Sequence, residues 1–259
     1  MPELPELAAF KKYIDQHCLH RKIDKVKVDD RTLLKGISSQ GFGRKIKGRE
    51  FISSERYGKY LFLKIQNDGY IMFHFGLTGS LEFYNDKKEK PKYGKIFIHF
   101  ADKNVLAYNS RRKLGYVKYV GDKQAYINSK RLGPDALCIS KEEFLALVKQ
   151  HKGAVKAFLM NQKIIAGIGN EYSDEILYQT RLHPLSKIEN IDAEILYKKM
   201  KNILSNAVEI NTEGKNYPES WLIDKRNEED TCPDCDGKIK KALIAGRSAY
   251  FCPECQQKN

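Results

Sequence analysis

Cys232-Pro233-Asp234-Cys235 and Cys252-Pro253-Glu254-Cys255, near the end of the 259-residue chain, decide most about its fold. The two knuckles supply four thiolates at a spacing typical of a tetrahedral zinc site, which leaves no open position for catalysis. A redox-active pair explains this spacing less well. Between the knuckles, Lys238–Ile244 and Ser248–Phe251 alternate as strands do. We therefore expect one structural Zn²⁺ in a β-hairpin finger that carries Arg247 at its turn.

The chain is strongly basic, with 46 Lys+Arg against 33 Asp+Glu and a formal net charge of +13 at pH 7. Such a surplus favours a polyanionic partner, because neutralising phosphates releases counterions and drives association. The sequence has no run of about 18 apolar residues and no signal-peptide pattern, so we expect neither a membrane span nor export. Cys18 and Cys138 stand alone, which is consistent with a reducing, cytoplasmic compartment.

The first half of the chain has the pattern of a β-domain. Short β-rich segments follow one another, with glycine and Asn/Asp turns between them. The expected strands are Lys22–Val28, Lys59–Gln66, Tyr70–Phe75, Lys95–Phe100, Val105–Tyr108 and Tyr116–Val120. Strands in such a succession favour an antiparallel sandwich or barrel, here preceded by a helix over about Pro5–Cys18. We assign residues 1–138 to this domain.

After Leu132-Gly133-Pro134-Asp135 the pattern becomes helical. Apolar residues recur at helical spacing, and Ser140 is a favourable N-cap. The expected helices are Ser140–Gln150, Val155–Ile165, Asn170–Gln179 and Asp192–Ile210. The sequence thus predicts an α+β multidomain protein, with a helical domain at 139–226 and the zinc finger at 227–259.

The opening residues Met1-Pro2-Glu3-Leu4-Pro5-Glu6 allow two interpretations. Pro5 and Glu6 suit the first turn of a helix. Alternatively, removal of Met1 exposes the secondary amine of Pro2 between two carboxylates. An α-amine has a pKa of roughly 7.7–8.0, so it is available as a nucleophile near neutral pH. Its attack on a sugar carbon gives an iminium, which is covalent catalysis.

Three turns are candidates for contact with nucleic acid. Ala166-Gly167-Ile168-Gly169-Asn170 precedes a helix, and the free N–H groups there form a phosphate cradle to which Asn170 can add a side-chain contact. The basic loop Arg111-Arg112-Lys113-Leu114 combines phosphate-binding residues with an apolar wedge. His74–Gly79 is a third turn, with Leu77 at its apex. Ordinary helix–helix and hairpin turns are the alternatives.

Together these segments resemble the bacterial formamidopyrimidine-DNA glycosylase and endonuclease VIII family over nearly the whole chain, and formamidopyrimidine-DNA glycosylase more closely. The matching segments, in family order, are Pro2–Glu6, Gly58–Leu61, His74–Gly79, Leu132–Asp135, Gly167–Tyr172 and Gly246–Ser248. The resemblance implies a β-sandwich, a helix–two-turn–helix in the helical domain and a zinc finger. It also implies a monomeric, nucleoid-associated base-excision repair enzyme that removes oxidised bases from double-stranded DNA.

The resemblance further implies a bifunctional glycosylase and AP lyase mechanism. The damaged nucleotide is flipped out of the stack. Pro2 attacks the anomeric carbon and expels the base, Glu3 acts as general acid, and Glu6 orients the terminus. β- and then δ-elimination cut the strand. Lys59 is counted with this catalytic set, at a position that grips the phosphates around the flipped nucleotide.

By the same resemblance, Asn170 and Arg247 grip phosphates, and Lys156 lies near the damaged base. The family fills the space left by the flipped base with methionine, arginine and phenylalanine. The aligned residues here are Leu77, Arg112 and Leu114. Leucine can act as a wedge but cannot stack on the orphaned base as an aromatic ring does. An acidic residue usual just before the basic loop is replaced by Ser110, and Asn211–Trp221 does not match the family's lesion-caging loop.

The same residues allow two other classes of function. A non-catalytic or narrowed-specificity binder of damaged or abasic DNA on the same fold is favoured by the altered wedge and caging loop. A zinc-ribbon RNA-binding protein accounts for the charge and the finger but leaves Pro2 and Glu3 unexplained.

Overall fold

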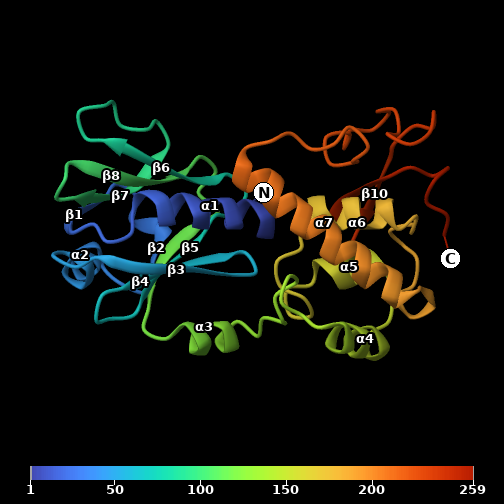
Figure 1. Ribbon diagram of the computed structural model, residues 1–259, viewed down its shortest axis with the longest axis horizontal. Helices are drawn as coiled ribbons and strands as arrows, with labels where there is room; N and C mark the ends of the chain where they lie inside the picture. Colours follow the sequence, from blue (N-terminus) through green and yellow to red (C-terminus); the bar gives the residue numbers. More distant parts are fainter. Residues whose placement is uncertain (1, 259) are drawn as a thin grey trace. The chain divides into compact units, whose positions relative to one another are not determined.

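The computed structural model describes residues 2–258, which form two compact units (Figure 1). Unit 1 comprises Pro2 and 6–130, and unit 2 comprises 3–5 and 131–258. The first helix, α1 (Leu4–His17), therefore begins in unit 2 and continues in unit 1. Across the described residues, every helix is too short or too polar to cross a membrane.

Unit 1 contains the β-sandwich that the sequence predicts. One sheet has the order β2-β9-β5-β4-β3 and the other the order β1-β7-β8-β6, antiparallel except for the short β2–β9 pairing. The strands are β1 (Ile23–Val28), β2 (Leu34–Lys35), β3 (Phe51–Tyr57), β4 (Tyr60–Ile65), β5 (Tyr70–His74), β6 (Gly79–Asn85), β7 (Gly94–Phe100), β8 (Asn104–Ser110) and β9 (Tyr116–Val120). Alternate residues of β4 and β7, such as Leu61 and Ile96, face a shared core that Leu7 and Ile14 of α1 join.

Several elements of unit 1 are not predicted from the sequence. They are β2, β3, β6, the 3₁₀ turn Arg31–Leu33, α2 (Ser39–Ile46) and α3 (Lys123–Ser129). Strand β3 reads Phe-Ile-Ser-Ser-Glu-Arg-Tyr, with polar residues on both faces, and owes its conformation to pairing with β4. Helices α2 and α3 are short, but side-chain caps at Ser38 and Asp122 mark their starts.

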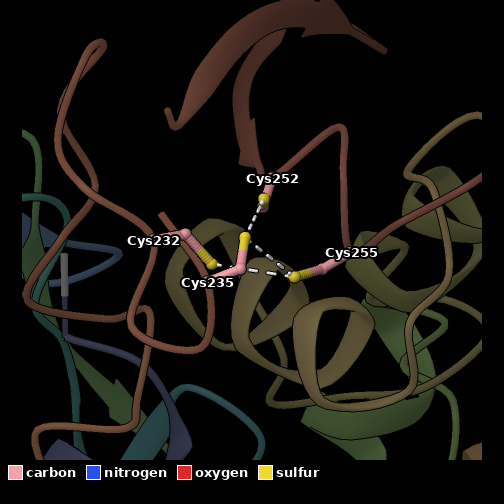
Figure 2. Close-up of side chains that lie close together, drawn as sticks. All are labelled: Cys232, Cys235, Cys252 and Cys255. Carbon is pink, nitrogen blue, oxygen red and sulfur yellow. Dashed lines mark hydrogen bonds between the residues drawn. The ribbon is translucent and has the colours of Figure 1, made fainter. Parts of the chain in front are cut away.

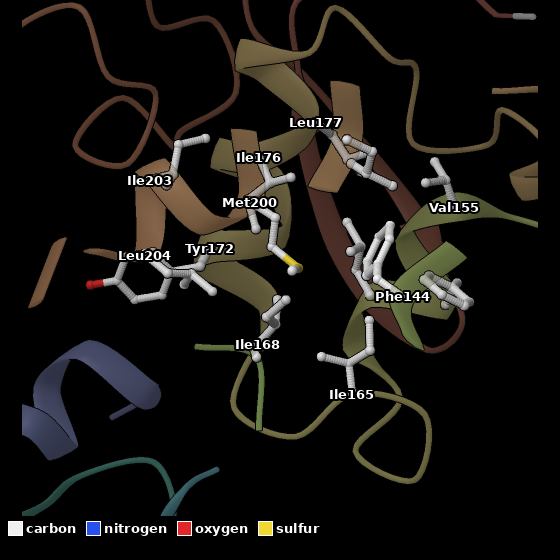
Figure 3. Close-up of a cluster of buried hydrophobic side chains, with 14 of the residues drawn as sticks. Phe144, Val155, Ile165, Ile168, Tyr172, Ile176, Leu177, Met200, Ile203 and Leu204 are labelled. Carbon is white, nitrogen blue, oxygen red and sulfur yellow. The ribbon is translucent and has the colours of Figure 1, made fainter. Parts of the chain in front are cut away.

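The helical part of unit 2 packs around a single apolar cluster (Figure 3). Its helices are α4 (Lys141–Gln150), α5 (Val155–Met160), α6 (Asn170–Gln179) and α7 (Ala193–Glu213), with a 3₁₀ turn at Ile188–Asn190. Ser140 and Glu143 form a reciprocal capping box at α4, and Asp192 caps α7. The predicted starts of α4 and α7 are thereby confirmed, and α6 begins at Asn170 as predicted.

The predicted helix Val155–Ile165 is too long, because α5 ends at Met160. Gln162 explains the end. Its side-chain amide donates to the carbonyls of Met160 and Ile168 at 2.9 and 2.6 Å and accepts from the Gly167 N–H at 3.0 Å. These bonds hold the chain in the turn that leads to α6.

The finger is the predicted β-hairpin, made by β10 (Lys240–Ile244) and β11 (Arg247–Phe251). Its turn consists of Ala245 and Gly246, both with positive φ (49° and 72°), as in the tight two-residue turns of hairpins. Arg247 therefore pairs with Ile244 as the first residue of β11 and is not part of the turn, which corrects the sequence-based placement.

Candidate functional site

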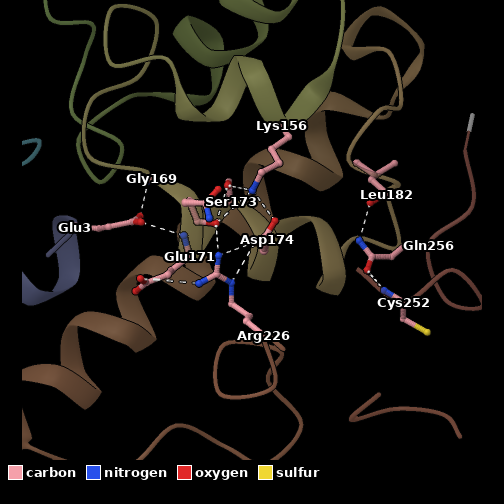
Figure 4. A network of polar contacts seen from close by, with 11 residues as sticks. Glu3, Lys156, Gly169, Glu171, Ser173, Asp174, Leu182, Arg226, Cys252 and Gln256 are labelled. Atoms are coloured by element: carbon pink, nitrogen blue, oxygen red, sulfur yellow. Dashed lines mark hydrogen bonds and ion pairs between the residues drawn. The ribbon is translucent and has the colours of Figure 1, made fainter. Parts of the chain in front are cut away.

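Glu3 lies at the N-terminus of α6. Its fully buried carboxylate accepts hydrogen bonds from the backbone N–H groups of Gly169 and Glu171, the latter at 3.0 Å (Figure 4). The positive end of the helix dipole favours a carboxylate there. The neighbouring Leu4 N–H donates to the Gly167 carbonyl at 3.1 Å. The Glu3 carboxylate and the Leu4 N–H are thus both hydrogen-bonded to backbone between Gly167 and Glu171.

This arrangement changes the interpretation of the glycine turn. Two of the N–H groups predicted to cradle a phosphate bind the protein's own carboxylate. Gly167 has φ +116°, and a Cβ there would lie 2.6 Å from the Leu4 side chain, so this position requires glycine. Asn170 Oδ1 is buried and has no hydrogen-bond partner within the described part of the chain.

A buried network of charges supports the first turn of α6 from inside unit 2. The Lys156 ammonium donates to Asp174 Oδ1 at 2.5 Å, to Ser173 Oγ at 2.9 Å and to the Asn170 carbonyl at 3.3 Å. Arg226 donates to the other oxygen of Asp174 from Nε at 3.1 Å and from Nη2 at 2.9 Å. Burial lowers the pKa of Lys156 and raises that of Asp174, while their opposite charges counteract both shifts.

Lys59 lies in unit 1, in the Gly58-Lys59 turn between β3 and β4. It is only 8% exposed. Burial, and then the positive charge of Lys59, lower the pKa of His74 to about 4. The imidazole of His74 is therefore neutral at physiological pH.

The two predicted wedge loops of unit 1 are bonded to each other. The Arg112 N–H donates to Thr78 Oγ1 at 3.0 Å, and a Cβ at Gly76 would lie 2.5 Å from the Leu114 carbonyl carbon. Leu114 is 53% exposed and Arg112 is exposed, whereas Leu77 is half-buried. Leu77 is therefore less accessible than a turn apex suggests. Ser110 is fully buried at the end of β8.

Pro2 and Glu6 lie close to Glu3 in the sequence. Both are half-buried, and Glu6 belongs to the first turn of α1. Met1, whose removal the nucleophile hypothesis requires, lies outside the described residues.

The four cysteines of the finger converge (Figure 2). Sulfur–sulfur distances are 3.8 Å for Cys232–Cys255, 3.6 Å for Cys235–Cys252 and 3.5 Å for Cys235–Cys255. A tetrahedral site with Zn–S bonds of about 2.3 Å needs about 3.8 Å between sulfurs, so the donor set fits Zn²⁺. Backbone N–H groups of Asp234 and Gly237 also point at two of the sulfurs.

The finger is anchored to the helical part of unit 2. The buried Gln256 amide donates to the Leu182 carbonyl at 2.8 Å and accepts from the Cys252 N–H at 2.9 Å (Figure 4). The Tyr178 hydroxyl of α6 lies 3.3 Å from Cys232 Sγ. Arg247 stays exposed on the hairpin.

Within unit 2 the structure thus gathers Glu3, Lys156 and Asn170 at one end of α6. Asp174, Arg226 and Gln256 are functional candidates that sequence reasoning missed. An isolated charge or amide carries no signal of its partners in a sequence. The cysteine spacing, by contrast, identifies the metal ligands directly.

Three family models match the chain. The formamidopyrimidine-DNA glycosylase N-terminal domain matches residues 1–117, the H2TH domain of the same enzyme residues 132–218, and a zinc finger found in FPG and IleRS residues 230–258. The formamidopyrimidine-DNA glycosylase of Arabidopsis thaliana is 32% identical over 277 residues, which cover 99% of this chain and 71% of that protein. That of Mycoplasma mobile is 30% identical over 279 residues, with full coverage of both. The chain belongs to the formamidopyrimidine-DNA glycosylase family.

Solved structures share the fold of this family member. The Lactococcus lactis Fpg in complex with DNA containing an abasic site has a TM-score of 0.89 at 23% identity, covering 99% of this chain and 100% of that one. MutM in complex with DNA containing carbocyclic 8-oxo-G has a TM-score of 0.87 at 23% identity. The β-sandwich, helical domain and four-cysteine finger expected from the sequence are confirmed as this fold.

Proposed function

We propose that the protein is a base-excision repair DNA glycosylase with AP lyase activity, which removes oxidised bases from double-stranded DNA. One observation carries the proposal: the Glu3 carboxylate is hydrogen-bonded to backbone N–H groups at the N-terminus of α6. Glu3 directly follows Pro2 in the chain, so this contact holds the neighbour of the proposed nucleophile in place. Family membership and the solved relatives, which are bound to abasic, N7-benzyl-Fapy-dG or carbocyclic 8-oxo-G DNA, support it.

Pro2 is the nucleophile once Met1 is removed. Its nitrogen lone pair forms a bond to C1′ of the damaged nucleotide as the C1′–base bond breaks, and the base leaves with that electron pair and takes up a proton. The Pro2 nitrogen then loses its proton to the Glu3 carboxylate. The nitrogen lone pair forms the C=N bond of the iminium as the C1′–O4′ bond opens, and Glu3 delivers that proton to O4′. β-Elimination expels the 3′ phosphate and δ-elimination the 5′ phosphate. Glu6 orients the terminus.

The phosphates around the flipped nucleotide bind to Lys59, Asn170 and Arg247. The net charge of +13 and the exposure of Arg247 support this role. Lys156 acts on the lesion side through the first turn of α6, which it contacts directly.

The space left in the duplex is filled by a wedge of Leu77, Arg112 and Leu114. The exposed Leu114 and the hydrogen bond between the two loops support this assignment, because a wedge must be both apolar and held in place. The zinc ion is structural, since four cysteines complete its coordination.

We further propose that the enzyme acts as a monomer, on the DNA of the cytoplasmic nucleoid. Its domains are the catalytic sandwich 1–138, the helical domain 139–226 and the finger 227–259.

A panel of duplexes tests the proposal. Protein with a verified Pro2 terminus is incubated with duplexes carrying 8-oxoguanine, a formamidopyrimidine, an oxidised pyrimidine or a bare abasic site. We expect strand cleavage with phosphate at both ends of the gap. Tight binding of abasic DNA without cleavage or borohydride-trapped adduct on any lesion would contradict the proposal and identify a non-catalytic binder.

A further inference from the structure

We propose that Arg226 is a positioning residue for Glu3, and that it couples the zinc-finger hairpin to the first turn of α6. The inference rests on the proposed function for its effect on rate. Arg226 lies in the irregular segment between α7 and the finger, and its side chain is 14% exposed.

On the α6 side, one guanidinium holds the turn that binds Glu3. Beyond its two bonds to Asp174, Arg226 Nη2 donates to the Asn170 carbonyl at 3.4 Å, and Nη1 lies 3.9 Å from Glu171 Oε1 (Figure 4). Glu171 is also the residue whose N–H binds the Glu3 carboxylate. A single side chain therefore contacts both Asn170 and Glu171, within the turn whose N–H groups bind Glu3.

Lys156 alone cannot replace this contact. It bonds to Oδ1 of Asp174, whereas Arg226 bonds to Oδ2, so each cation satisfies a different oxygen of a fully buried carboxylate. Removing Arg226 leaves one buried oxygen without its charged donor, which is costly in a dry interior. The least costly response is movement of the first turn of α6, and with it of Glu3.

On the finger side, the same guanidinium lies over an aromatic ring. The Arg226 guanidinium carbon is 5.1 Å from the centroid of Tyr250, within the range of a cation–π contact. Tyr250 belongs to β11, the strand that begins with Arg247. Arg226 thus links the hairpin, which we propose binds DNA, to the turn that positions Glu3.

Arg226→Ala and Arg226→Lys test the inference, with Arg181→Ala as the matched control. Arg181 also joins α6 to the finger: it pairs with Asp234 and lies 5.9 Å from the Tyr178 ring, but these contacts do not involve the first turn of α6. Zinc content is measured first, and each variant is expected to retain one ion.

For Arg226→Ala we expect the single-turnover rate of adduct formation on saturating abasic DNA to fall roughly 30- to 100-fold. The Kd for a tetrahydrofuran duplex should rise only about threefold or less. Added guanidinium should restore part of the rate, Arg226→Lys should be intermediate, and Arg181→Ala should react as wild type. An unchanged rate, or equal losses of rate and affinity without rescue, would overturn the inference.

Amide hydrogen exchange tests the positioning without any reaction. In Arg226→Ala, the N–H groups of Gly169 and Glu171 should exchange about tenfold faster or more, and they should be unaffected in Arg181→Ala. Unchanged exchange would refute the inference even if the enzyme is active. Failure of wild-type protein to form an adduct would instead count against the proposed function.

Discussion

The Glu3 carboxylate accepts a 3.0 Å hydrogen bond from the backbone N–H of Glu171, the second residue of α6. The carboxylate to which we assign proton transfer is thereby also bound by the free N–H groups at the N-terminus of a helix. Its partners are backbone N–H groups, which cannot change rotamer as a side-chain donor can. This explains why the residue beside the proposed nucleophile is fully buried although it lies at the beginning of the chain.

Replacing Glu3 should therefore cost both stability and activity. In Glu3→Gln, loss of the negative charge at the helix N-terminus should lower the free energy of unfolding by about 1–2 kcal/mol. Single-turnover excision should fall by about a hundredfold or more, because the general acid is removed. Urea unfolding and a gel assay measure the two effects. Glu142→Gln, the same change in the exposed first turn of α4, is the control, and an equal loss of stability there would contradict the account.

The wedge assignment predicts a change in base flipping at nearly constant stability. Leu114 is 53% exposed, so Leu114→Ala should leave the melting temperature almost unchanged. Loss of the apolar insertion should lower the equilibrium constant for base flipping roughly fivefold, which corresponds to about 1 kcal/mol. A fluorescent base beside the lesion follows the flipping. Ile195→Ala removes an apolar side chain of similar exposure (52%) from α7. Equal flipping by Leu114→Ala and Ile195→Ala would exclude Leu114 from the wedge.

The finger predicts one tightly bound zinc ion per chain. Gln256 joins the finger to Leu182, just after α6, and Tyr178 joins it to α6 itself. Chelation of the ion should therefore lower the melting temperature of the helical part as well as unfold the hairpin. Cys252→Ser should have the same effect. Cys138→Ser changes an exposed cysteine outside the cluster and should retain the metal. Zinc bound at full stoichiometry by Cys252→Ser would show that the ion is held elsewhere.

Glu175 predicts a pH dependence of stability. Burial raises its pKa to about 7, against an ordinary value of 4.5, although Gln179 and the Ile223 N–H donate to it. The folded protein holds this proton more tightly than the unfolded chain. Its contribution to the free energy of unfolding therefore falls as pH rises from about 4.5 to 7, by roughly 2–4 kcal/mol.

Glu175→Gln should remove this dependence. The melting temperature of the variant relative to wild type should increase between pH 5 and pH 8, while that of the exposed-site control Glu209→Gln should stay level. A difference between Glu175→Gln and wild type that is constant with pH would show that Glu175 does not carry the proton.

Much of the fold can be predicted from local sequence signals. The cysteine spacing identifies the finger, Ser140 and Asp192 mark helix starts, and period-2 runs identify the sandwich strands whose faces are buried. Strand β3 is missed because its polar residues lie on both faces and its conformation depends on pairing with β4. The end of α5 is missed because a single side chain, Gln162, closes the turn.

The candidate site is predicted less completely, for a physical reason. The motif residues are recognised as types, but their partners come from distant parts of the chain. Glu3 binds backbone 166 and 168 residues away, and Arg226 pairs with Asp174 across 52 residues. Such contacts depend on the completed fold. Sequence reasoning therefore names Lys156 but assigns it to DNA, and overlooks the buried pair that it forms with Asp174.

The central claim is that the amine of Pro2 forms the covalent bond to DNA. The most direct measurement is borohydride reduction of a reaction with abasic DNA, followed by mass mapping of the modified peptide. The account predicts the adduct on Pro2 in protein that has lost Met1, and no adduct in protein that retains it. An adduct on Lys59 or Lys156, or none from protein with a verified Pro2 terminus, would contradict it.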